Sequence, residues 1–269
     1  MTAPLRVEVV VPVGGMGGAE AMALSVLDHQ AHRLDVRVLG LGESPFLDAA
    51  RERGLPVAVV PTGRRAGDVA RAAAVLARRW RRSDVEVVWA NGVKPAAAAV
   101  PAGLLTGVPV VWAKHDFSYD ARLARPLAAG SAAVVAVSEL VAEATRRRDV
   151  VVLPPPRPAV PAPTPRLVPE AALVAAVVGR LARYKGVDDA IVGLPEPWHL
   201  AIIGDDDPTG PGHRDELAAL ARAAGVADRV HFLGSVPDAA RLLPGVDAVL
   251  VVTKPDARGL GREGWSMVA

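Results

Sequence analysis

The stretch "LVAAVVGRLARYKGVDDAI", residues 173–191, decides how the chain folds. It begins with six apolar residues, which is typical of a strand buried on both faces of a parallel sheet. A short polar loop follows, and Gly186 marks the turn into a helix that we expect at residues 187–192. Strand, loop and helix in this order form half of a βαβ unit. The stretch therefore predicts an α/β protein with a parallel sheet.

Two cations lie on the loop of this stretch. Arg180 and Lys185 are five residues apart, just before the expected helix start. Like charges this close repel each other unless an anion lies between them, and a guanidinium with an ammonium forms a charge-assisted clamp for a diphosphate. Two solvated loop cations are the alternative interpretation.

The same alternation continues on both sides of this stretch. Short Val-rich runs alternate with Ala/Leu/Arg segments of helical period, which indicates repeated βαβ units. In the first half, strands are expected at residues 7–13, 36–41, 57–60, 85–90, 110–113, 132–137 and 150–153, and helices at 19–32, 46–53, 66–82, 95–105 and 139–147. In the second half, strands are expected at residues 173–178, 199–203, 230–233 and 248–252, and helices at 187–192, 214–224 and 239–243.

A proline-rich segment separates the two halves. "PPPRPAVPAPTPRLVP", residues 154–169, contains eight prolines in sixteen residues, and proline neither continues a helix nor donates a backbone hydrogen bond. We predict an N-terminal Rossmann-like domain at residues 1–153, a semi-rigid linker at 154–169 and a second α/β domain at 170–269. Two doubly wound domains are expected to hold a ligand in the cleft between them, beside the carboxyl ends of their strands.

The composition argues against several classes of protein. The chain has 269 residues, of which 51% are hydrophobic, so a buried core is expected, and its net charge of +2 is too small for nucleic-acid binding. It has no cysteine, no signal-peptide layout and no apolar run of the roughly 20 residues that cross a membrane. We expect a cytoplasmic protein. The arginine clusters at residues 78–82 and 146–148 are expected to offset helix dipoles, with membrane-surface contact on the cytoplasmic face as the alternative for the first.

The first expected strand leads into a glycine-rich loop. In "PVGGMGGAEAMAL", residues 12–24, Gly17 and Gly18 precede a helix, where backbone N–H groups can approach a phosphate. The dinucleotide fingerprint G-x-G-x-x-G is absent, because Glu20 occupies the position of its last glycine. We expect phosphate or substrate contact here, with a tight turn without ligand as the alternative.

The loop after the fifth expected strand contains a histidine. In "WAKHDFSYD", residues 112–120, His115 is expected to carry a proton or contact a sugar hydroxyl, and capping of local backbone is the alternative. The sequence nearby offers no cysteine or second histidine for a metal site. The lysines are expected to face the cleft, because all four follow expected strands: Lys94, Lys114, Lys185 and Lys254.

Two polar features have a structural interpretation. Ser138 is expected to cap the N-terminus of the helix at residues 139–147, because the nucleophile motif G-x-S-x-G is missing. The acid run at residues 205–207 is expected to be a solvated turn, with a Mg²⁺ site as the alternative.

Seven features, taken in order, resemble glycosyltransferase family 4. They are "GGAE" (17–20), His115, "VGRLARYKGVDDAI" (178–191), "AIIGDD" (201–206), "DRVHFLGSVPD" (228–238), "VDAVLVV" (246–252) and "REGWSM" (262–267). The resemblance covers almost the whole chain and is strongest after the proline-rich segment. Each feature alone is weak, but the ordered set is specific.

The resemblance implies a GT-B architecture, in which two Rossmann-like domains face each other across a cleft. It also implies a retaining transfer of a sugar from a nucleotide-diphosphate sugar, without a metal or other cofactor. Catalysis is implied for His115, Glu263, Arg180 and Lys185. Donor contacts are implied for Gly17, Gly18, Arg180, Lys185, Ser235, Val236, Glu263, Gly264, Trp265, Ser266 and Met267.

The resemblance assigns the acceptor to loops of the first domain. These loops lie around Met16, Asn91, Lys94, Phe117 and Tyr119, and the acceptor is a glycan, a lipid or a small molecule. A glycosidase-like pair of carboxylates is not evident. We therefore expect the departing phosphate oxygen to help deprotonate the acceptor hydroxyl, while cations stabilise the growing charge.

The family's Glu-x7-Glu motif extends beyond the sequence. Its second glutamate would fall at position 271, so the resemblance implies an incomplete second domain, weak donor binding and low turnover. Two other functions stay open from the sequence. One is a GT-B-like nucleotide-sugar epimerase that needs no acceptor, and the other is a non-catalytic nucleotide-sugar-binding module.

Overall fold

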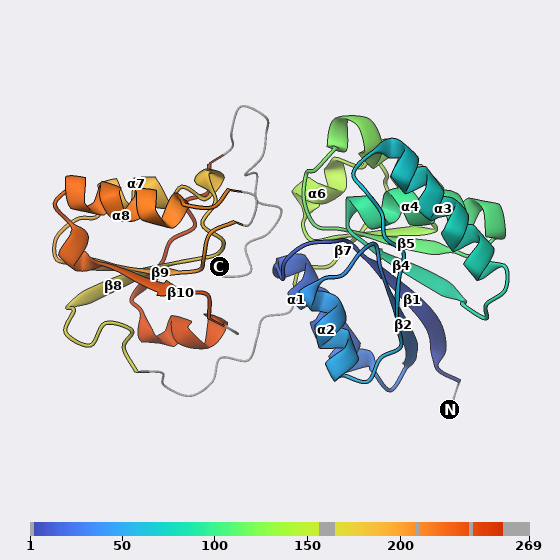
Figure 1. Cartoon of the computed structure of the whole chain (residues 1–269), viewed down its shortest axis with the longest axis horizontal. Helices are drawn as coiled ribbons and strands as arrows, with labels where there is room; N and C mark the ends of the chain where they lie inside the picture. Colours follow the sequence, from blue (N-terminus) through green and yellow to red (C-terminus); the bar gives the residue numbers. More distant parts are fainter. Residues whose placement is uncertain (1–2, 156–164, 208–209, 237–238, 255–269) are drawn as a thin grey trace. The chain divides into compact units, whose positions relative to one another are not determined.

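The computed structural model describes residues 3–155, 165–207, 210–236 and 239–254 (Figure 1). The chain divides into two compact units, Met1–Pro156 and Arg157–Ala269. Each unit has its own sheet and its own hydrophobic core.

The first unit is built on a parallel sheet. Its strands are β1 (Leu5–Val11), β2 (Leu34–Gly40), β3 (Val57–Val59), β4 (Val87–Asn91), β5 (Val110–Lys114), β6 (Ala133–Ala136) and β7 (Val151–Val152). They lie in the order β3-β2-β1-β4-β5-β6-β7, and each neighbouring pair is parallel. The seven strands expected from the sequence are confirmed. The central strands are mostly buried, whereas β3 and β7 at the two edges of the sheet are partly exposed.

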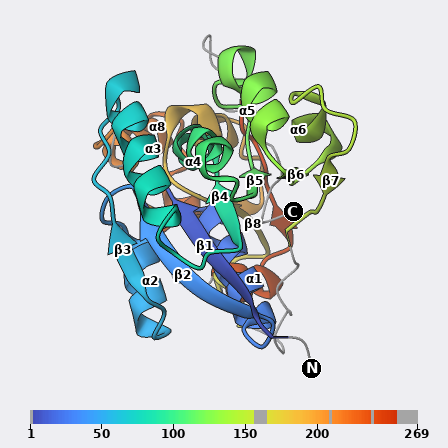
Figure 2. The same ribbon diagram turned by 90° about the vertical axis from the view of Figure 1, so that its right-hand side faces the viewer.

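Helices cover both faces of this sheet. One face packs against α1 (Gly18–Gln30) and α2 (Pro45–Glu52). The other packs against α3 (Ala66–Trp80), α4 (Val93–Thr106) and α5 (Arg125–Gly130). Figure 2 shows α4 between α3 and α5 in front of the strands. This doubly wound arrangement leaves the carboxyl ends of the strands and the N-termini of the helices at one edge of the sheet.

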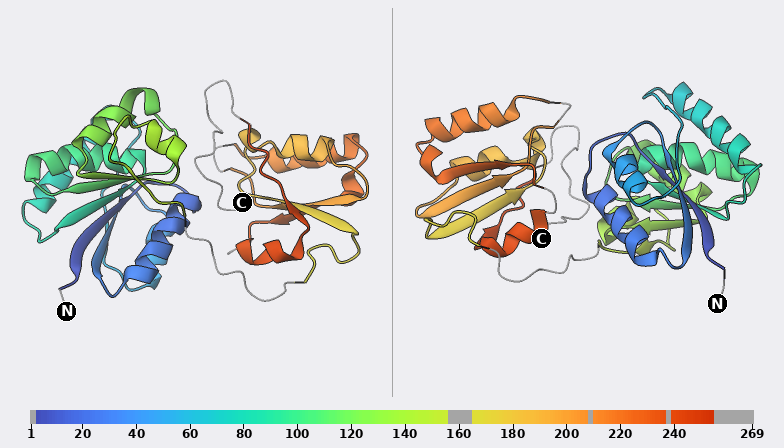
Figure 3. Two further views of the ribbon diagram at one scale, coloured as in Figure 1. Left: turned by 180° about the vertical axis from the view of Figure 1, so that it is seen from behind. Right: turned by 60° about the horizontal axis from the view of Figure 1, so that its bottom comes forward.

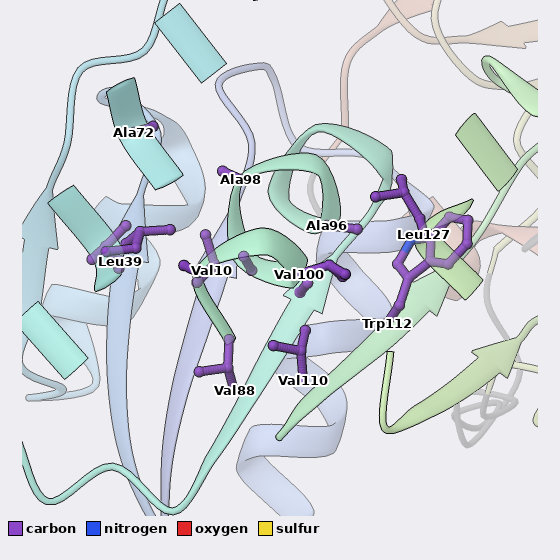
Figure 4. Close-up of a cluster of buried hydrophobic side chains, with 14 of the residues drawn as sticks. Val10, Leu39, Ala72, Val88, Ala96, Ala98, Val100, Val110, Trp112 and Leu127 are labelled. Atoms are coloured by element: carbon purple, nitrogen blue, oxygen red, sulfur yellow. The ribbon is translucent and has the colours of Figure 1, made fainter. Parts of the chain in front are cut away.

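The core under α3, α4 and α5 is formed by small and branched side chains (Figure 4). Val10 and Val88 extend from the sheet, and Ala96 and Val100 face them from α4. Alanines allow the helix to approach the sheet closely, and Trp112 fills the space toward α5. This cluster fixes the ends of β4 and β5, from which two candidate site residues extend.

Local signals set the ends of several helices. The Ser138 hydroxyl accepts a hydrogen bond from the Val141 N–H at 3.3 Å, so its predicted role as the N-cap of α6 (Glu139–Glu143) is confirmed. Pro45 begins α2, where the missing N–H costs nothing. Gly107 ends α4 with a left-handed φ of 80°, which a residue with a Cβ adopts only at a cost.

One buried carboxylate connects β1 to the end of α3. Glu8 is 0% exposed and accepts hydrogen bonds from Arg79 Nε at 2.8 Å and from Trp80 Nε1 at 2.6 Å. Two donors thus satisfy a charge that burial would otherwise make very costly. Part of the arginine cluster at residues 78–82 therefore has an internal structural role.

The second unit contains a smaller parallel sheet. Its described strands are β8 (Leu173–Val178), β9 (Trp198–Ile203), β10 (Val230–Gly234) and β11 (Ala248–Val249), in the order β10-β9-β8-β11. α7 (Val187–Val192) and α8 (His213–Ala223) lie on one face of this sheet. The 3-10 helix η4 (Ala239–Gly245) lies on the other face, as Figure 3 shows. Two shorter 3-10 turns, η2 (Arg183–Lys185) and η3 (Ala227–Arg229), complete the described elements.

Some elements differ from the expected ones. The helix expected at residues 139–147 ends at Glu143, and Arg146 has a left-handed φ of 55° that stops it. No element was expected at residues 120–130, which form the π-helical turn η1 (Asp120–Ala124) followed by α5, where Pro126 favours a helix start. The helix expected at residues 239–243 is present as the 3-10 helix η4. Val168, within the segment predicted to be the linker, is buried in the core of the second unit.

The arginines at residues 146–148 therefore do not end a helix. Arg147 instead donates to the carbonyl oxygens of Ala128 and Ser131 at 2.9 and 2.7 Å. It thereby connects the loop after α6 to the end of α5. In the described parts of the chain, no helix is both long enough and apolar enough to cross a membrane.

Candidate functional site

The first unit has a topological switch point between β1 and β4. β2 and β3 lie on one side of β1, and the chain then crosses to β4 on the other side. Loops that leave the carboxyl ends of such neighbouring strands run in opposite directions and leave room for a ligand between them. The glycine-rich loop after β1 and Asn91 at the end of β4 lie at this point.

Three loops meet around His115. Its Nε2 atom is 2.8 Å from Asn91 Oδ1, and the Asn91 amide nitrogen donates to the Ala19 carbonyl oxygen at 3.5 Å. Because the amide oxygen is the acceptor in this network, His115 carries its proton on Nε2 and leaves Nδ1 as an acceptor. The sequence predictions for His115 and Asn91 thus converge on one site, which the start of α1 completes.

The imidazole of His115 is uncharged at neutral pH. Burial lowers its pKa to about 4, and the neighbouring ammonium of Lys114 acts in the same direction against the opposing effect of Asp116. A base this weak takes up few protons near pH 7. His115 is therefore suited to hydrogen bonding with a substrate group rather than to carrying a proton.

Asn91 has a different position from the one expected of an acceptor contact. It is 1% exposed and both ends of its amide are engaged, so it orients His115 instead of presenting itself to a ligand. The sequence placed it in the right loop, but only the contact with His115 reveals this orienting function.

Lys114 does not face a ligand site, contrary to expectation. Its side chain is 0% exposed, and its ammonium donates to Asp120 Oδ1 at 2.5 Å and to the carbonyl oxygen of Asp116. The rings of Trp112 and Phe117 lie beside it, at 5.7 and 5.9 Å from Nζ. Lys114 therefore fixes the loop that follows His115 from the inside.

The glycine-rich loop is closed by its own glutamate. Gly17 is the N-cap of α1, and its N–H donates to Glu20 Oε2 at 3.1 Å. An anion that approached the Gly17 N–H would have to displace this carboxylate, which corrects the expectation that Gly17 is open to a phosphate. Gly18 begins the helix, where N–H groups have no intrahelical acceptor. Met16 is exposed on the same loop.

The other residues predicted to contact the acceptor differ in their bonding partners and in how far their side chains are exposed. Lys94 donates to the Thr62 carbonyl oxygen at 2.8 Å, and partial burial lowers its pKa. Phe117 packs against the cluster around Met22. Tyr119 is 71% exposed with a φ of 58°, so its ring extends from the surface of the loop. Met16 and Tyr119 are the two exposed side chains of this set.

The second unit has its switch point between β8 and β11. β9 and β10 lie on one side of β8, and β11 lies on the other. The loop after β8 contains Arg180 and Lys185, as the sequence predicted. A Cβ on Gly186 would lie 2.1 Å from the Val252 carbonyl oxygen, so this glycine permits the close approach of the two loops.

Arg180 forms an ion pair at this switch point. Its Nη1 atom is 3.0 Å from Asp207 Oδ2, and its Nη2 atom is 3.5 Å from the Tyr184 hydroxyl. The arginine side chain is 54% exposed, whereas that of Asp207 is 11% exposed. Lys185 is half-buried, with its ammonium 5.8 Å from the centre of the Tyr184 ring. The two predicted cations therefore lie on one loop, at the edge where a ligand is expected.

The acid run is exposed to solvent at Asp205, but all three of its carboxylates also bind other parts of the chain. Asp205 accepts from the Ser235 N–H at 2.9 Å, and Asp206 accepts from the N–H groups of Gly212 and Arg214, both at 2.7 Å. Asp207 holds Arg180. Each carboxylate thus fixes a different segment, namely the loop after β10, the start of α8 and the loop after β8.

Ser235 and Val236 differ in what they expose. Ser235 is exposed at the end of β10, whereas Val236 packs against the hydrophobic cluster that contains Val168. The side chain of Val236 is therefore engaged in packing. Glu263, Gly264, Trp265, Ser266 and Met267 lie outside the described residues.

The expectation that all four lysines line a ligand site is wrong. Lys114 is buried, Lys94 bonds a carbonyl oxygen, and Lys254 binds the carboxylates of Asp188 and Asp189 at 2.9 Å each. The role of Lys185 at a ligand site stays a prediction. Across the described residues, no group of three or more His, Cys, Asp or Glu side chains is arranged to hold a metal ion.

Sequence reasoning missed two kinds of site residue. Asp120 and Glu20 follow a candidate residue by a few positions, so a search for local carboxylates could have found them. Asp205 and Asp207 pair with residues about 30 and 27 positions away, and no local signal identifies such partners.

Comparisons with known proteins agree for both units. Residues 16–160 match the family model described as Glycosyltransferase Family 4, and residues 164–269 match that described as Glycosyl transferases group 1. None of the curated proteins compared with the chain matches it.

Several solved structures are similar in fold. Anabaena HepE in complex with UDP-glucose has a TM-score of 0.75 and 20% identity, over 94% of this chain and 76% of that one. Sucrose-phosphate synthase from Thermosynechococcus elongatus has a TM-score of 0.69 and 14% identity, over 98% and 78%. MurG from Acinetobacter baumannii has a TM-score of 0.62 and 16% identity, over 91% and 73%.

The fold and the family models lead to one assignment. Two Rossmann-like units, with similarity to GT-B glycosyltransferases across nearly the whole chain, agree with family models that together span most of its length. The chain belongs to glycosyltransferase family 4.

Proposed function

We propose that the protein transfers a sugar from a nucleoside diphosphate sugar to a hydroxyl group of an acceptor, with retention of configuration. The observation that carries this proposal is the exposed Arg180 beside Lys185 at the switch point of the second unit. The chemistry needs cations there, because breaking the sugar–phosphate bond leaves negative charge on the diphosphate. The complex of Anabaena HepE with UDP-glucose makes UDP-glucose the first donor to test.

The residues of the second unit would bind the leaving group. Arg180 offers several N–H donors in a planar fork, and Lys185 adds a point charge on the same loop. The Ser235 loop, fixed by Asp205, would border the nucleoside. Glu263 and the four residues after it keep their predicted role at the sugar and phosphates.

The first unit would contact the transferred sugar through His115. Since its imidazole is uncharged and Asn91 binds Nε2–H, the Nδ1 atom is available to accept a hydrogen bond from a sugar hydroxyl. The base for the acceptor hydroxyl is then the departing phosphate oxygen, on the same face of the sugar as the leaving group. This same-face route gives retention without a covalent sugar–enzyme intermediate. Met16 and Tyr119 would border the acceptor.

Donor hydrolysis and transfer to a panel of sugar, lipid and small-molecule hydroxyls test the proposal. Purified protein is incubated with UDP-, GDP- and ADP-glucose, and the anomeric configuration of any product is read by NMR. Arg180→Ala and Lys185→Ala should each lower kcat/KM by about 100-fold, in line with the loss of one charge-stabilising donor. Arg183→Ala is the matched control, because Arg183 lies on the same loop but binds Glu216 at 2.6 Å.

Four outcomes would refute parts of this proposal. An inverted product or a sugar covalently attached to the protein excludes the same-face route. Isomerised nucleotide sugar without acceptor indicates an epimerase. Donor binding that never leads to turnover with any acceptor indicates a binding module.

We also propose that the outer face of α4 contacts an anionic membrane surface. Leu104 and Leu105 are 70% and 63% exposed at the end of this helix. Arg81 donates to the Leu105 carbonyl oxygen at 3.4 Å, so the cations at the end of α3 lie beside the leucines. The helix dipole accounts for cations at this end, but not for two adjacent exposed leucines. Arginine beside exposed apolar side chains is the composition that binds anionic lipid.

Vesicle co-sedimentation tests this contact. Wild-type protein should bind vesicles that contain phosphatidylglycerol, bind phosphatidylcholine vesicles weakly, and dissociate as salt increases. The double variant Leu104→Gln/Leu105→Gln should bind at least several-fold less, because two apolar side chains no longer enter the interface. Leu140→Gln is the control, since Leu140 is also exposed but lies on α6. Equal binding by all three proteins would exclude α4 as the contact.

A further inference from the structure

Three consecutive carboxylates organise the carboxyl edge of the second sheet. Asp205, Asp206 and Asp207 accept hydrogen bonds from three different segments. Backbone pairing holds the run in place, because the Leu181 N–H donates to the Asp205 carbonyl oxygen at 2.8 Å. Leu181 is fully buried, so this hydrogen bond joins the acid run to the loop after β8 at a packed position.

Asp207 is the member of this run that binds one of the two cations predicted to contact the diphosphate of the donor. It is 8% exposed and accepts from Arg180 Nη1, whereas the arginine side chain is more than half exposed. A guanidinium has five N–H donors in a fixed plane, and one carboxylate oxygen engages one of its nitrogens here. Arg180 can therefore be held by Asp207 and bind a second anion at the same time.

The carboxylate has two opposite effects on a bound diphosphate. Its charge repels the phosphates, but it also orders an arginine that would otherwise lose several rotatable bonds on binding. Asp207 is largely shielded from solvent on the protein side of the guanidinium, and its charge is already paired with it. The ordering effect should therefore exceed the repulsion, and the pair should favour binding.

We propose that Asp207 is a positioning residue, which holds the Arg180 guanidinium in place for the diphosphate of the donor. The proposal rests on the nucleotide-sugar function given above. It differs from a structural role in one respect: the loss of Asp207 should affect ligands with a diphosphate and leave the fold and ligands without phosphate unchanged.

The first experiment needs no ligand. The Nε–Hε resonance of Arg180, assigned by its loss in Arg180→Lys, should have the relaxation of an ordered group in the wild type and of a mobile group in Asp207→Ala. Asp215→Ala, an exposed acid on α8, is the control and should leave it ordered. An Arg180 side chain that is equally ordered in Asp207→Ala overturns the proposal, whatever the protein binds.

The second experiment measures nucleotide binding by calorimetry. UDP, GDP and ADP are titrated into wild type, and the tightest of them and its nucleoside are then titrated into the variants. Asp207→Ala should weaken diphosphate binding about tenfold and leave the nucleoside unchanged. Asp207→Asn, which keeps an acceptor for Nη1, should recover most of this loss.

The outcomes separate the two proposals. Wild type that binds none of the three diphosphates refutes the proposed function, whereas the relaxation result still decides whether Asp207 orders Arg180. Tighter binding by Asp207→Ala shows that the carboxylate competes with the donor, and it overturns the positioning role. Equal losses for the diphosphate and the nucleoside, or a lowered melting temperature, show a structural role and overturn it as well.

Discussion

The charged groups beside His115 and those beside Arg180 differ in how much water reaches them. Lys114 is 0% exposed and its partner Asp120 is 19% exposed, whereas the Arg180 side chain is 54% exposed over Asp207. Removing one partner of a buried pair leaves an uncompensated charge, but an exposed partner is simply hydrated. The first pair therefore belongs to the fold, and the second leaves its cation available to a ligand.

Among the variants that test this difference, Lys114→Met is expected to have the largest effect on stability. The variant keeps most of the side-chain volume but leaves Asp120 without its cation, so the free energy of unfolding of the first unit should fall by about 3–5 kcal/mol. Urea unfolding followed by amide exchange in peptides from residues 3–155 measures it. Lys94→Met is the control and should cost less, roughly 1.5 kcal/mol, because it removes one charge-assisted hydrogen bond to a carbonyl oxygen and leaves no charge without its partner. Equal losses in both variants would contradict the comparison.

The pH dependence of stability tests how strongly the surroundings of His115 disfavour a charged imidazole. Its pKa is lowered to about 4 in the folded protein against about 6.5 in an unfolded chain. Between these values the unfolded chain binds more protons, so stability is complete above pH 6.5 and falls as the pH drops toward 4. The loss attributable to His115 should approach roughly 3 kcal/mol at pH 4.

The pH dependence of unfolding in His115→Asn isolates this contribution. The variant should lose less stability between pH 6.5 and pH 4 than the wild type does. His32→Asn, which replaces an exposed imidazole, is the control for removing a histidine from the surface. Parallel curves for wild type and His115→Asn would show that the imidazole is not held uncharged.

A variant of Glu8 tests whether burial, rather than closeness to the candidate site, makes a charged residue important for stability. In Glu8→Met, Arg79 is half-exposed and can be hydrated, but the buried Trp80 N–H loses its acceptor. The free energy of unfolding of the first unit should fall by about 1–3 kcal/mol. Glu86→Met removes an exposed acid that binds Arg6, and it should have a much smaller effect in the same urea titration.

The smallest effect is expected for Lys254 of the second unit. Its ammonium binds Asp188 and Asp189, but all three side chains are at least one-third exposed. Lys254→Met should therefore change the free energy of unfolding by only about 0.2–1 kcal/mol. The effect should shrink further in high salt. A loss comparable to that of Lys114→Met, measured on peptides from the second unit, would remove the distinction between the two regions.

The strands and the loops that follow them were predictable from local patterns. Val-rich runs identify buried parallel strands, and polar residues that follow such runs must lie at the carboxyl edge of a sheet. This reasoning placed His115, Asn91, Arg180 and Lys185 at or just after the carboxyl ends of strands, where the structure has them. It did not show which side chains at the edge are buried.

Lys114 illustrates why the sequence was insufficient there. It shares strand parity with Trp112 and so faces the side of the sheet that η1 and α5 cover. Those two elements were not expected, so the cover over Lys114 and its partner Asp120 were not expected either. The acid run at residues 205–207 was misinterpreted for the same reason, because its donors come from distant segments.

The sequence by itself determined the parallel α/β architecture and the family, because apolar periodicity and ordered motifs are local properties of the chain. Only the tertiary structure decided which charged residues are part of the fold and which are available to a ligand. Burial and pairing depend on segments far apart in sequence. A lysine after a strand is therefore a structural residue at position 114 and a candidate ligand contact at position 185.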